Sequence, residues 1–202
     1  MSFPILTILA LLPLVGGAIV LGVKGRSGRA TGLVISIVTA VLGVIAFIAA
    51  ANGTDVSENY HWIKAIGAWY ALSSDGLGMT LVLMTVILVP VVLLAEWNIG
   101  EKKPSDGTQT WGANVFSGLA LMTEGLAIYC FTAVDVLFFY LIFEASLVPM
   151  YFLIGVWGGE RRQYASLKFF LYTMFGSALM LVAFVAIFIR TDSVSFSIPY
   201  LT

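Results

Sequence analysis

The stretch Ala133–Val156 reads AVDVLFFYLIFEASLVPMYFLIGV. It is long and apolar enough to form one membrane-crossing helix, which needs about 20 predominantly apolar residues. Glu144 lies near the middle of this stretch. A carboxylate at that depth costs roughly 2.5–3.5 kcal/mol on insertion scales, so such an acid is by default a candidate for function. The stretch therefore predicts a membrane helix whose acid is suited to proton or ion movement.

The rest of the chain has the same apolar character. Of the 202 residues, 60% are hydrophobic and only 10% are charged, with a mean hydropathy of +1.00. We expect an all-α, polytopic helix bundle that forms a single transmembrane domain. The chain starts without a basic region, so we interpret the first span as a retained helix and not as a signal peptide. The six predicted spans are 3–23, 30–50, 77–97, 112–131, 133–156 and 165–189.

The positions of the basic residues predict an orientation. Loops rich in Lys and Arg stay on the cytoplasmic or matrix side of a membrane. If six helices alternate, eight of the ten basic residues fall on one side, which places the N-terminus outside. The net charge of −1 gives no indication of a nucleic-acid partner. The eight residues are Lys24, Arg26, Arg29, Lys102, Lys103, Arg161, Arg162 and Lys168, and the other two are Lys64 and Arg190.

The sequence offers few groups for other kinds of chemistry. Cys130 is the only cysteine and His61 the only histidine. An internal disulfide, a multi-cysteine metal site and an iron–sulfur site are thereby excluded within this chain. A catalytic triad and a phosphate-binding glycine loop are also missing. We therefore expect no cofactor and no metal in this chain.

Helical spacing places Tyr140, Glu144 and Tyr151 on roughly one face of the fifth span. Pro149 removes the backbone hydrogen bond to Ala145 and tends to bend the helix one turn from the acid. Desolvation favours the neutral form of such a carboxyl, whereas a nearby moving positive charge favours its ionised form. We read Glu144 as a proton relay, and the alternative is a glutamate fixed in an interhelical hydrogen bond.

Three further charged residues are weaker candidates. Glu124 lies in the middle of the fourth span, where it could form a relay with Glu144 if the two helices face each other, or make a structural hydrogen bond. Asp135 begins the fifth span, and we favour a helix-capping role for it. Lys168 lies near the start of the sixth span, where it could serve proton entry, although anchoring of the topology is the simpler reading.

Small residues and aromatic residues predict how the spans are arranged. Gly32, Ser36, Thr39 and Gly43 recur on one face of the second span, which favours close helix packing. The triplet 176–178, Gly-Ser-Ala, is expected to interrupt the sixth span. The segment 52–78 is expected to be a loop on the outer surface, with its aromatic residues at the level of the headgroups.

Several of these stretches together resemble a known family. They are residues 133–144 and 147–159, then KFFLYT at 168–173, and the Asp-Gly-Leu at 75–77 that opens the third span. The pattern resembles the antiporter-like membrane subunit M (chain 4) of respiratory complex I. The resemblance covers the whole chain, and the motif of the fifth span is highly specific to antiporter-like proteins.

This resemblance implies a proton-translocating subunit of NADH:quinone oxidoreductase without a redox centre of its own, in which Glu144 tunes a central lysine. NADH, flavin, iron–sulfur clusters and quinone are then expected in partner subunits, reached through other membrane subunits of the complex and its redox arm. The implied location is the bacterial plasma (inner) membrane or the mitochondrial inner membrane. Family members have more than twice as many helices, so the chain corresponds to the N-terminal portion of the family fold.

Two other readings are open. The same motifs occur in subunits of multi-subunit cation/proton antiporters, for which transport would depend on sodium and not on NADH. A structural membrane anchor with inert buried carboxylates is the third reading, and it predicts that pumping survives the loss of Glu144.

Overall fold

The computed structural model describes residues 4–23, 26–63, 67–97 and 111–190. Within these residues, six helices are long and apolar enough to span a membrane, so the predicted all-α, multi-pass bundle is confirmed. The elements, in chain order, are α1 (Ile5–Gly22), α2 (Arg26–Ala51), β1 (Glu58–Ile63), β2 (Ala68–Leu72), α3 (Gly76–Ala95), α4 (Ala113–Thr132), α5 (Val136–Trp157) and α6 (Arg162–Arg190).

The helix boundaries differ from the predicted spans by at most four residues. Helix α5 begins three residues later than expected because Asp135 is its N-cap and accepts a hydrogen bond from the Phe138 amide at 3.0 Å. The capping role predicted for Asp135 is thus confirmed. Helix α6 begins three residues earlier than expected. The interruption predicted at residues 176–178 is wrong, because the helix is continuous from Arg162 to Arg190. A Cβ built on Gly176 would meet no atom within 4 Å.

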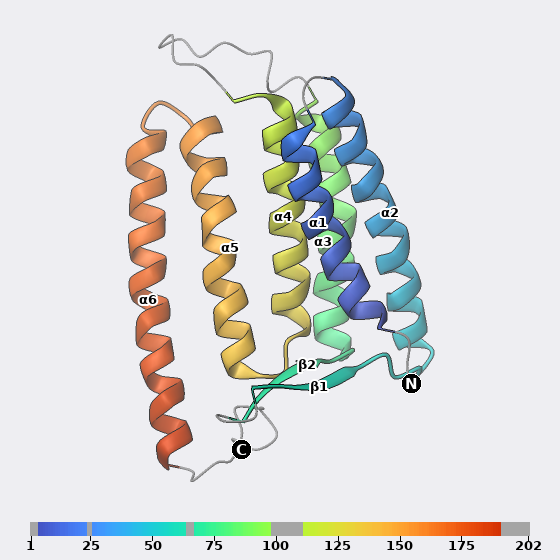
Figure 1. Ribbon diagram of the computed structural model, residues 1–202, viewed down its shortest axis with the longest axis vertical. Helices are drawn as coiled ribbons and strands as arrows, with labels where there is room; N and C mark the ends of the chain where they lie inside the picture. Colours follow the sequence, from blue (N-terminus) through green and yellow to red (C-terminus); the bar gives the residue numbers. More distant parts are fainter. Residues whose placement is uncertain (1–3, 24–25, 64–66, 98–110, 191–202) are drawn as a thin grey trace.

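A β-hairpin occupies most of the segment that was expected to be a loop. Strands β1 and β2 pair antiparallel, and Gly67, in the turn, has a φ of 65°. The Tyr70 ring packs on Phe138 at a centroid distance of 5.1 Å and on Tyr129 at 6.3 Å. Through Tyr70 the hairpin packs against helix ends, and it lies across one end of the bundle (Figure 1), which we call the hairpin end.

Helices α1 to α4 form a four-helix bundle (Figure 1). Helices α1 and α4 approach so closely that a Cβ on Gly17 would lie 2.6 Å from the Gly118 carbonyl oxygen. A Cβ on Gly125 would lie at the same distance from the Ala10 carbonyl oxygen. The predicted packing face of α2 is also confirmed, since Ser36 and Thr39 on it are fully buried.

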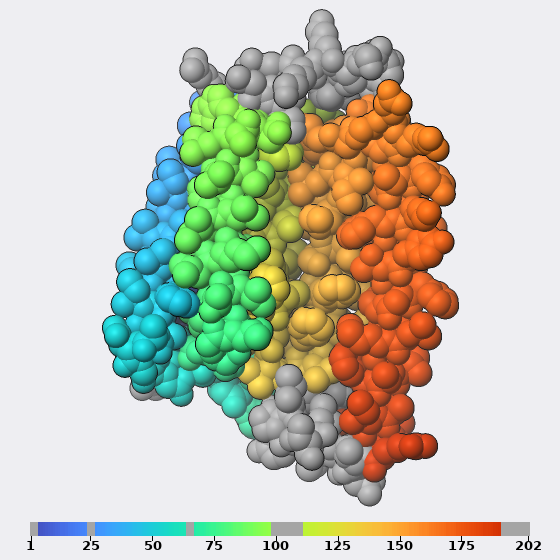
Figure 2. All heavy atoms as spheres, turned by 180° about the vertical axis from the view of Figure 1, so that it is seen from behind, coloured from blue at the N-terminus to red at the C-terminus, as the bar shows by residue number. Residues whose placement is uncertain are grey.

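Helices α5 and α6 form an antiparallel pair beside this bundle (Figure 1). In the view from behind, α4 and α5 are visible between α3 on one side and α6 on the other (Figure 2). Within the described residues, the main packing partner of α6 is α5, and the buried residues of α6 are Ser166 and Ser177. Arg162 begins α6 at the end opposite the hairpin, and Arg190 ends it at the hairpin end. Lys24, Lys64, Lys102 and Lys103 lie outside the described residues.

Candidate functional site

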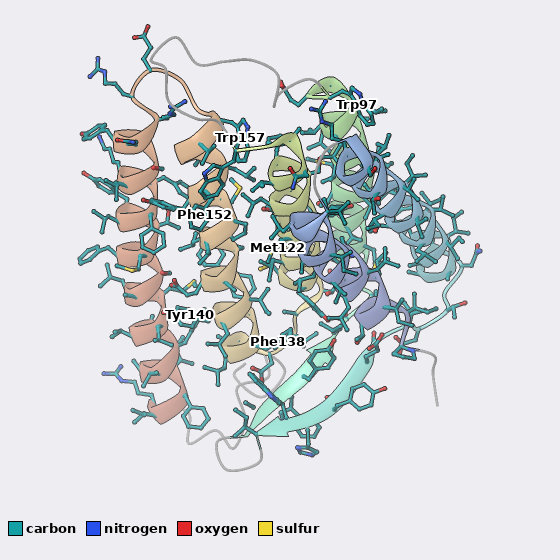
Figure 3. The ribbon with its side chains drawn as sticks, turned by 45° about the horizontal axis from the view of Figure 1, so that its top comes forward. Trp97, Met122, Phe138, Tyr140, Phe152 and Trp157 are labelled. Atoms are coloured by element: carbon teal, nitrogen blue, oxygen red, sulfur yellow. The ribbon has the colours of Figure 1, made fainter. Side chains whose placement is uncertain are left out.

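Glu144 lies at the contact between α5 and α6. Its side chain is half-buried, and its Oε1 accepts a hydrogen bond from the Ser177 hydroxyl of α6. Tyr140 lies one turn earlier on α5, on the same face as this carboxylate. Figure 3 shows Tyr140 in the region between the two helices. The carboxylate therefore has a hydroxyl partner on the neighbouring helix.

The face of α5 that contains Glu144 is the face that meets α6. The Tyr151 ring lies 5.7 Å from the Phe170 ring, and a Cβ on Gly155 would lie 3.1 Å from the Ser166 hydroxyl. The prediction that Tyr140, Glu144 and Tyr151 share one face is therefore confirmed. Another side of α5 packs toward α4, where the Phe152 ring lies 5.6 Å from the ring of Trp111, two residues before α4 begins.

Ser177 can serve both protonation states of Glu144. Its hydroxyl is close to Glu144 Oε1 and also lies 2.9 Å from the Met174 carbonyl oxygen. A serine hydroxyl has one hydrogen to donate and two lone pairs to accept with. When Glu144 is ionised, Ser177 can donate to it. When Glu144 is protonated, it can donate to Ser177, which then donates to Met174. The site thus holds a carboxylate and a carboxylic acid without leaving a donor unsatisfied.

Pro149 adds a local irregularity to α5 close to the acid. It is buried within the helix and has no amide hydrogen, so the Ala145 carbonyl lacks its usual partner. The Ser146 hydroxyl donates to the Phe143 carbonyl at 2.6 Å, beside Glu144. Free backbone acceptors and hydroxyls next to the carboxylate are groups on which water can be held.

Glu124 is separated from Glu144 by the arrangement of the helices. Its side chain is 1% exposed in the α1–α4 bundle, and neither carboxyl oxygen has a hydrogen-bond partner within the described residues. Glu144, in contrast, is turned toward α6. The two acids therefore lie in different helix contacts, and the condition stated for a direct relay, that their helices present them to each other, is not met in the described structure.

Lys168 also lies apart from Glu144. It is exposed, and its Nζ is 5.7 Å from the Tyr164 ring centroid and 5.6 Å from that of Tyr172, within cation–π range. Nine residues separate Lys168 from Ser177, which amounts to half a turn in direction and about 13 Å along the helix. The lysine is thus on the opposite face of α6 from the serine that contacts Glu144.

A hydrogen-bond network at the hairpin end was missed by the sequence reasoning. Glu58 of β1 is 2% exposed, and its Oε1 accepts from the amides of Leu6 at 2.8 Å and Thr7 at 3.1 Å. Glu58 Oε2 accepts from the Thr7 hydroxyl, which lies 2.6 Å from the Tyr70 hydroxyl. Burial raises the pKa of Tyr70. The carboxylate caps the first turn of α1 from a strand 51 residues away in sequence, which no local pattern could indicate.

Asp135 connects the same hairpin to the helices. Besides capping α5, its Oδ2 accepts from the Trp69 amide at 3.1 Å, and the residue is fully buried. Within the described residues, no group of three or more His, Cys, Asp or Glu side chains is placed to hold a metal ion. Glu58 and Asp135 at the hairpin end thus have structural partners in the first turns of α1 and α5 and in the hairpin.

Comparison with known proteins gives the class of this membrane chain. Residues 133–201 match the family model described as NADH:quinone oxidoreductase/Mrp antiporter, TM. The chain resembles a chain in respiratory complex I from Thermus thermophilus with bound NADH, with a TM-score of 0.82 and 29% identity over 97% of this chain and 38% of that one. The Mrp complex from Dietzia sp. shares the fold, with a TM-score of 0.75 at 20% identity over 97% of this chain and 20% of that one.

Curated relatives narrow the class to one kind of subunit. NADH-quinone oxidoreductase subunit M from Mycobacterium tuberculosis is 34% identical over 94% of this chain and 39% of its own length. The subunit M from Rhodobacter capsulatus is 35% identical over 97% of this chain and 39% of its own length. The chain therefore resembles the antiporter-like subunit M (chain 4) of NADH-quinone oxidoreductase, as its sequence motifs predict. It spans less than two-fifths of the length of these relatives.

Proposed function

We propose that the chain is the N-terminal portion of a proton-translocating membrane subunit of NADH:quinone oxidoreductase. In this proposal Glu144 is a proton relay near the middle of the membrane, and it is coupled to redox chemistry in other subunits. The observation that carries the proposal is the half-buried Glu144 carboxyl with Ser177 beside it, because this pair can hold or release a proton. The relatives named as subunit M support the assignment to this complex.

Glu124 and Lys168 have secondary places in this proposal. Each is separated from Glu144 in the described structure, so a proton could pass between them only through further groups or water. We propose Lys168 as an entry group at the end of α6 opposite the hairpin, where its aromatic neighbours hold it near the membrane surface. Glu124 is proposed as a separate proton-holding group within the α1–α4 bundle.

The cofactors and partners follow from the same proposal. This chain would carry no cofactor, and NADH, flavin, iron–sulfur clusters and quinone would belong to partner subunits. Its partners would be the lipid bilayer, the other membrane subunits of complex I and, through them, the redox arm. The membrane would be the bacterial plasma (inner) membrane or the mitochondrial inner membrane.

The proposed function can be tested by exchange of segments. The corresponding N-terminal part of a bacterial subunit M is replaced by residues 1–202, and NADH-driven proton uptake is followed in inverted vesicles. We expect uptake that an uncoupler abolishes and that is unchanged when sodium is replaced by choline. Uptake that needs sodium and ignores NADH would favour a cation/proton antiporter. An assembled complex that oxidises NADH without pumping would contradict the proposal.

The proposed orientation has the N-terminus outside, so the hairpin end should face outward. Single cysteines at the exposed positions Asn59 and Glu160, introduced with Cys130→Ser, are expected to differ in labelling. An impermeant thiol reagent should modify Asn59→Cys in intact cells and Glu160→Cys only after the membrane is opened. The reverse pattern would overturn the orientation given by the basic residues.

The Ser177 contact predicts an intermediate effect on pumping. Ser177→Ala removes the hydroxyl of α6 that can donate to ionised Glu144, and a hydrogen bond to a charged group contributes about 1.5–3 kcal/mol. We expect NADH-driven pumping to fall by about tenfold or more, since each 1.4 kcal/mol corresponds to a factor of ten. The matched control is Thr173→Val, one turn away on α6, because the Thr173 hydroxyl bonds only to the Phe169 carbonyl. Equal effects of the two variants would contradict a specific role for Ser177.

A further inference from the structure

Two polar side chains are buried without partners in the α1–α4 bundle. Both carboxyl oxygens of Glu124 on α4 and the hydroxyl of Ser36 on α2 lack a hydrogen bond within the described residues. Glu124 is 1% exposed and Ser36 is 0% exposed. Buried polar groups in proteins are satisfied by protein or by ordered water, so each of these groups requires an explanation.

The contacts between α2 and α4 place these two side chains in one layer. A Cβ on Gly32 would lie 3.0 Å from the Ser117 Cβ, so these residues are opposite each other. The two helices run in the same direction (Figure 1). Counting seven residues further along both helices from this contact brings Thr39 to about the level of Glu124. Ser36 is one turn before Thr39. Because helical side chains lean toward the N-terminus, the Glu124 carboxyl extends toward the level of Ser36.

Helix α3 brings a proline to the same layer. A Cβ on Gly43 would lie 2.7 Å from a Val86 methyl group, and α2 and α3 are antiparallel. Pro90, four residues after Val86, is therefore level with Thr39, four residues before Gly43. Pro90 cannot donate to the Val86 carbonyl, so this buried residue presents a free acceptor.

Helix α1 brings a second proline to this level. A Cβ on Gly16 would lie 2.7 Å from the Ile35 side chain, and α1 and α2 are also antiparallel. Pro13 is therefore close to the level of Thr39. The buried Pro13 leaves the carbonyl of the buried Leu9 without its helical donor. The layer thus combines one carboxyl, two hydroxyls and two backbone carbonyls that their helices do not satisfy fully.

In the described helices around Glu124, no basic residue lies near its level. Helices α1, α3 and α4 contain no Lys, Arg or His, and the only basic residues of α2 are Arg26 and Arg29 in its first turn. Arg29 is ten residues before Thr39, about 15 Å away along the helix. The only charged residue of α5 is Glu144, which is turned toward α6. An ionised Glu124 would be an unpaired buried charge, which is strongly unfavourable.

We propose that this layer is a water-binding site in which a neutral Glu124 donates its proton to a buried water, and the water donates to Ser36. A buried water makes about three hydrogen bonds, so one molecule can accept from the Glu124 hydroxyl, donate to Ser36 and still reach a further acceptor. The Thr39 hydroxyl, which donates to Ile35 at 3.0 Å, keeps a free lone pair for this purpose. This site goes beyond the relay at Glu144 and does not depend on it.

Infrared spectroscopy of the chain in lipid nanodiscs tests the site. A Glu144→Gln background leaves Glu124 as the only acid at membrane depth in the described helices. We expect a carboxylic-acid stretching band at neutral pH that is absent after Glu124→Gln. The band should shift in deuterium oxide and shift again in Ser36→Ala. The control is Ser117→Ala, on the same face of α4, because the Ser117 hydroxyl is satisfied by the Ala113 carbonyl at 3.0 Å.

Three outcomes would overturn the proposal. Carboxylate bands in place of the acid band would show an ionised Glu124. An acid band that ignores Ser36→Ala would show that the two side chains share no water. Loss of the acid band when potassium is replaced by sodium would assign the layer to a metal cation. NMR of isotope-labelled glutamate in the Glu144→Gln chain distinguishes acid from carboxylate even if Glu124→Gln fails to fold.

Discussion

An assembled complex that contains Glu144→Gln is expected to lose more than nine-tenths of its NADH-driven proton pumping. Glutamine keeps the shape of glutamate, and its amide oxygen can still accept from Ser177. The amide of glutamine cannot bind and release a proton at the pH at which the complex works. The expected loss of tenfold or more corresponds to at least about 1.4 kcal/mol in the barrier for proton transfer.

The measurement is proton uptake by inverted vesicles, normalised to the amount of assembled complex. Glu144→Asp should retain more pumping than Glu144→Gln, because the shorter acid still titrates. Glu124→Gln should have a milder effect than Glu144→Gln. The matched control is Glu160→Gln, an exposed acid just after α5, which should pump normally. Normal pumping in assembled Glu144→Gln would refute the relay and favour a structural membrane anchor.

The largest expected effect on folding comes from Gly125. Even the Cβ of an alanine there would lie 2.6 Å from the Ala10 carbonyl oxygen and 3.1 Å from the Leu14 amide nitrogen. These are backbone atoms, so α1 as a whole must move away from α4. Overpacking in a well-packed core typically costs about 1–3 kcal/mol. We expect Gly125→Leu to prevent stable folding and Gly125→Ala to lower the thermal midpoint clearly.

The thermal midpoint and the yield of monodisperse protein in detergent measure this effect. The matched control is Gly176→Ala in α6, where no atom lies within 4 Å of the added Cβ. Alanine also has the higher helix propensity, so this control should be neutral or slightly stabilising. If the two alanine variants had equal midpoints, the close contact between α1 and α4 would not contribute to stability as described.

Local features of the sequence predict much of the fold. The six spans follow from apolar length, since a helix that satisfies its own backbone is one of few structures that lipid permits. The capping role of Asp135 and the shared face of Tyr140, Glu144 and Tyr151 follow from spacing within one helix. The hairpin was missed because its stability comes from Tyr70 packing on Phe138 of a different element.

The sequence by itself determined that the chain crosses the membrane six times and carries two acids at membrane depth. Insertion depends on each segment alone, so composition and length suffice for this. Only the tertiary structure decided how each helix is rotated about its own axis. That rotation directs Glu144 toward Ser177, encloses Glu124 among α1–α4 and leaves Lys168 on the far side of α6. It depends on close contacts such as Gly125 against Ala10, which join residues far apart in the sequence.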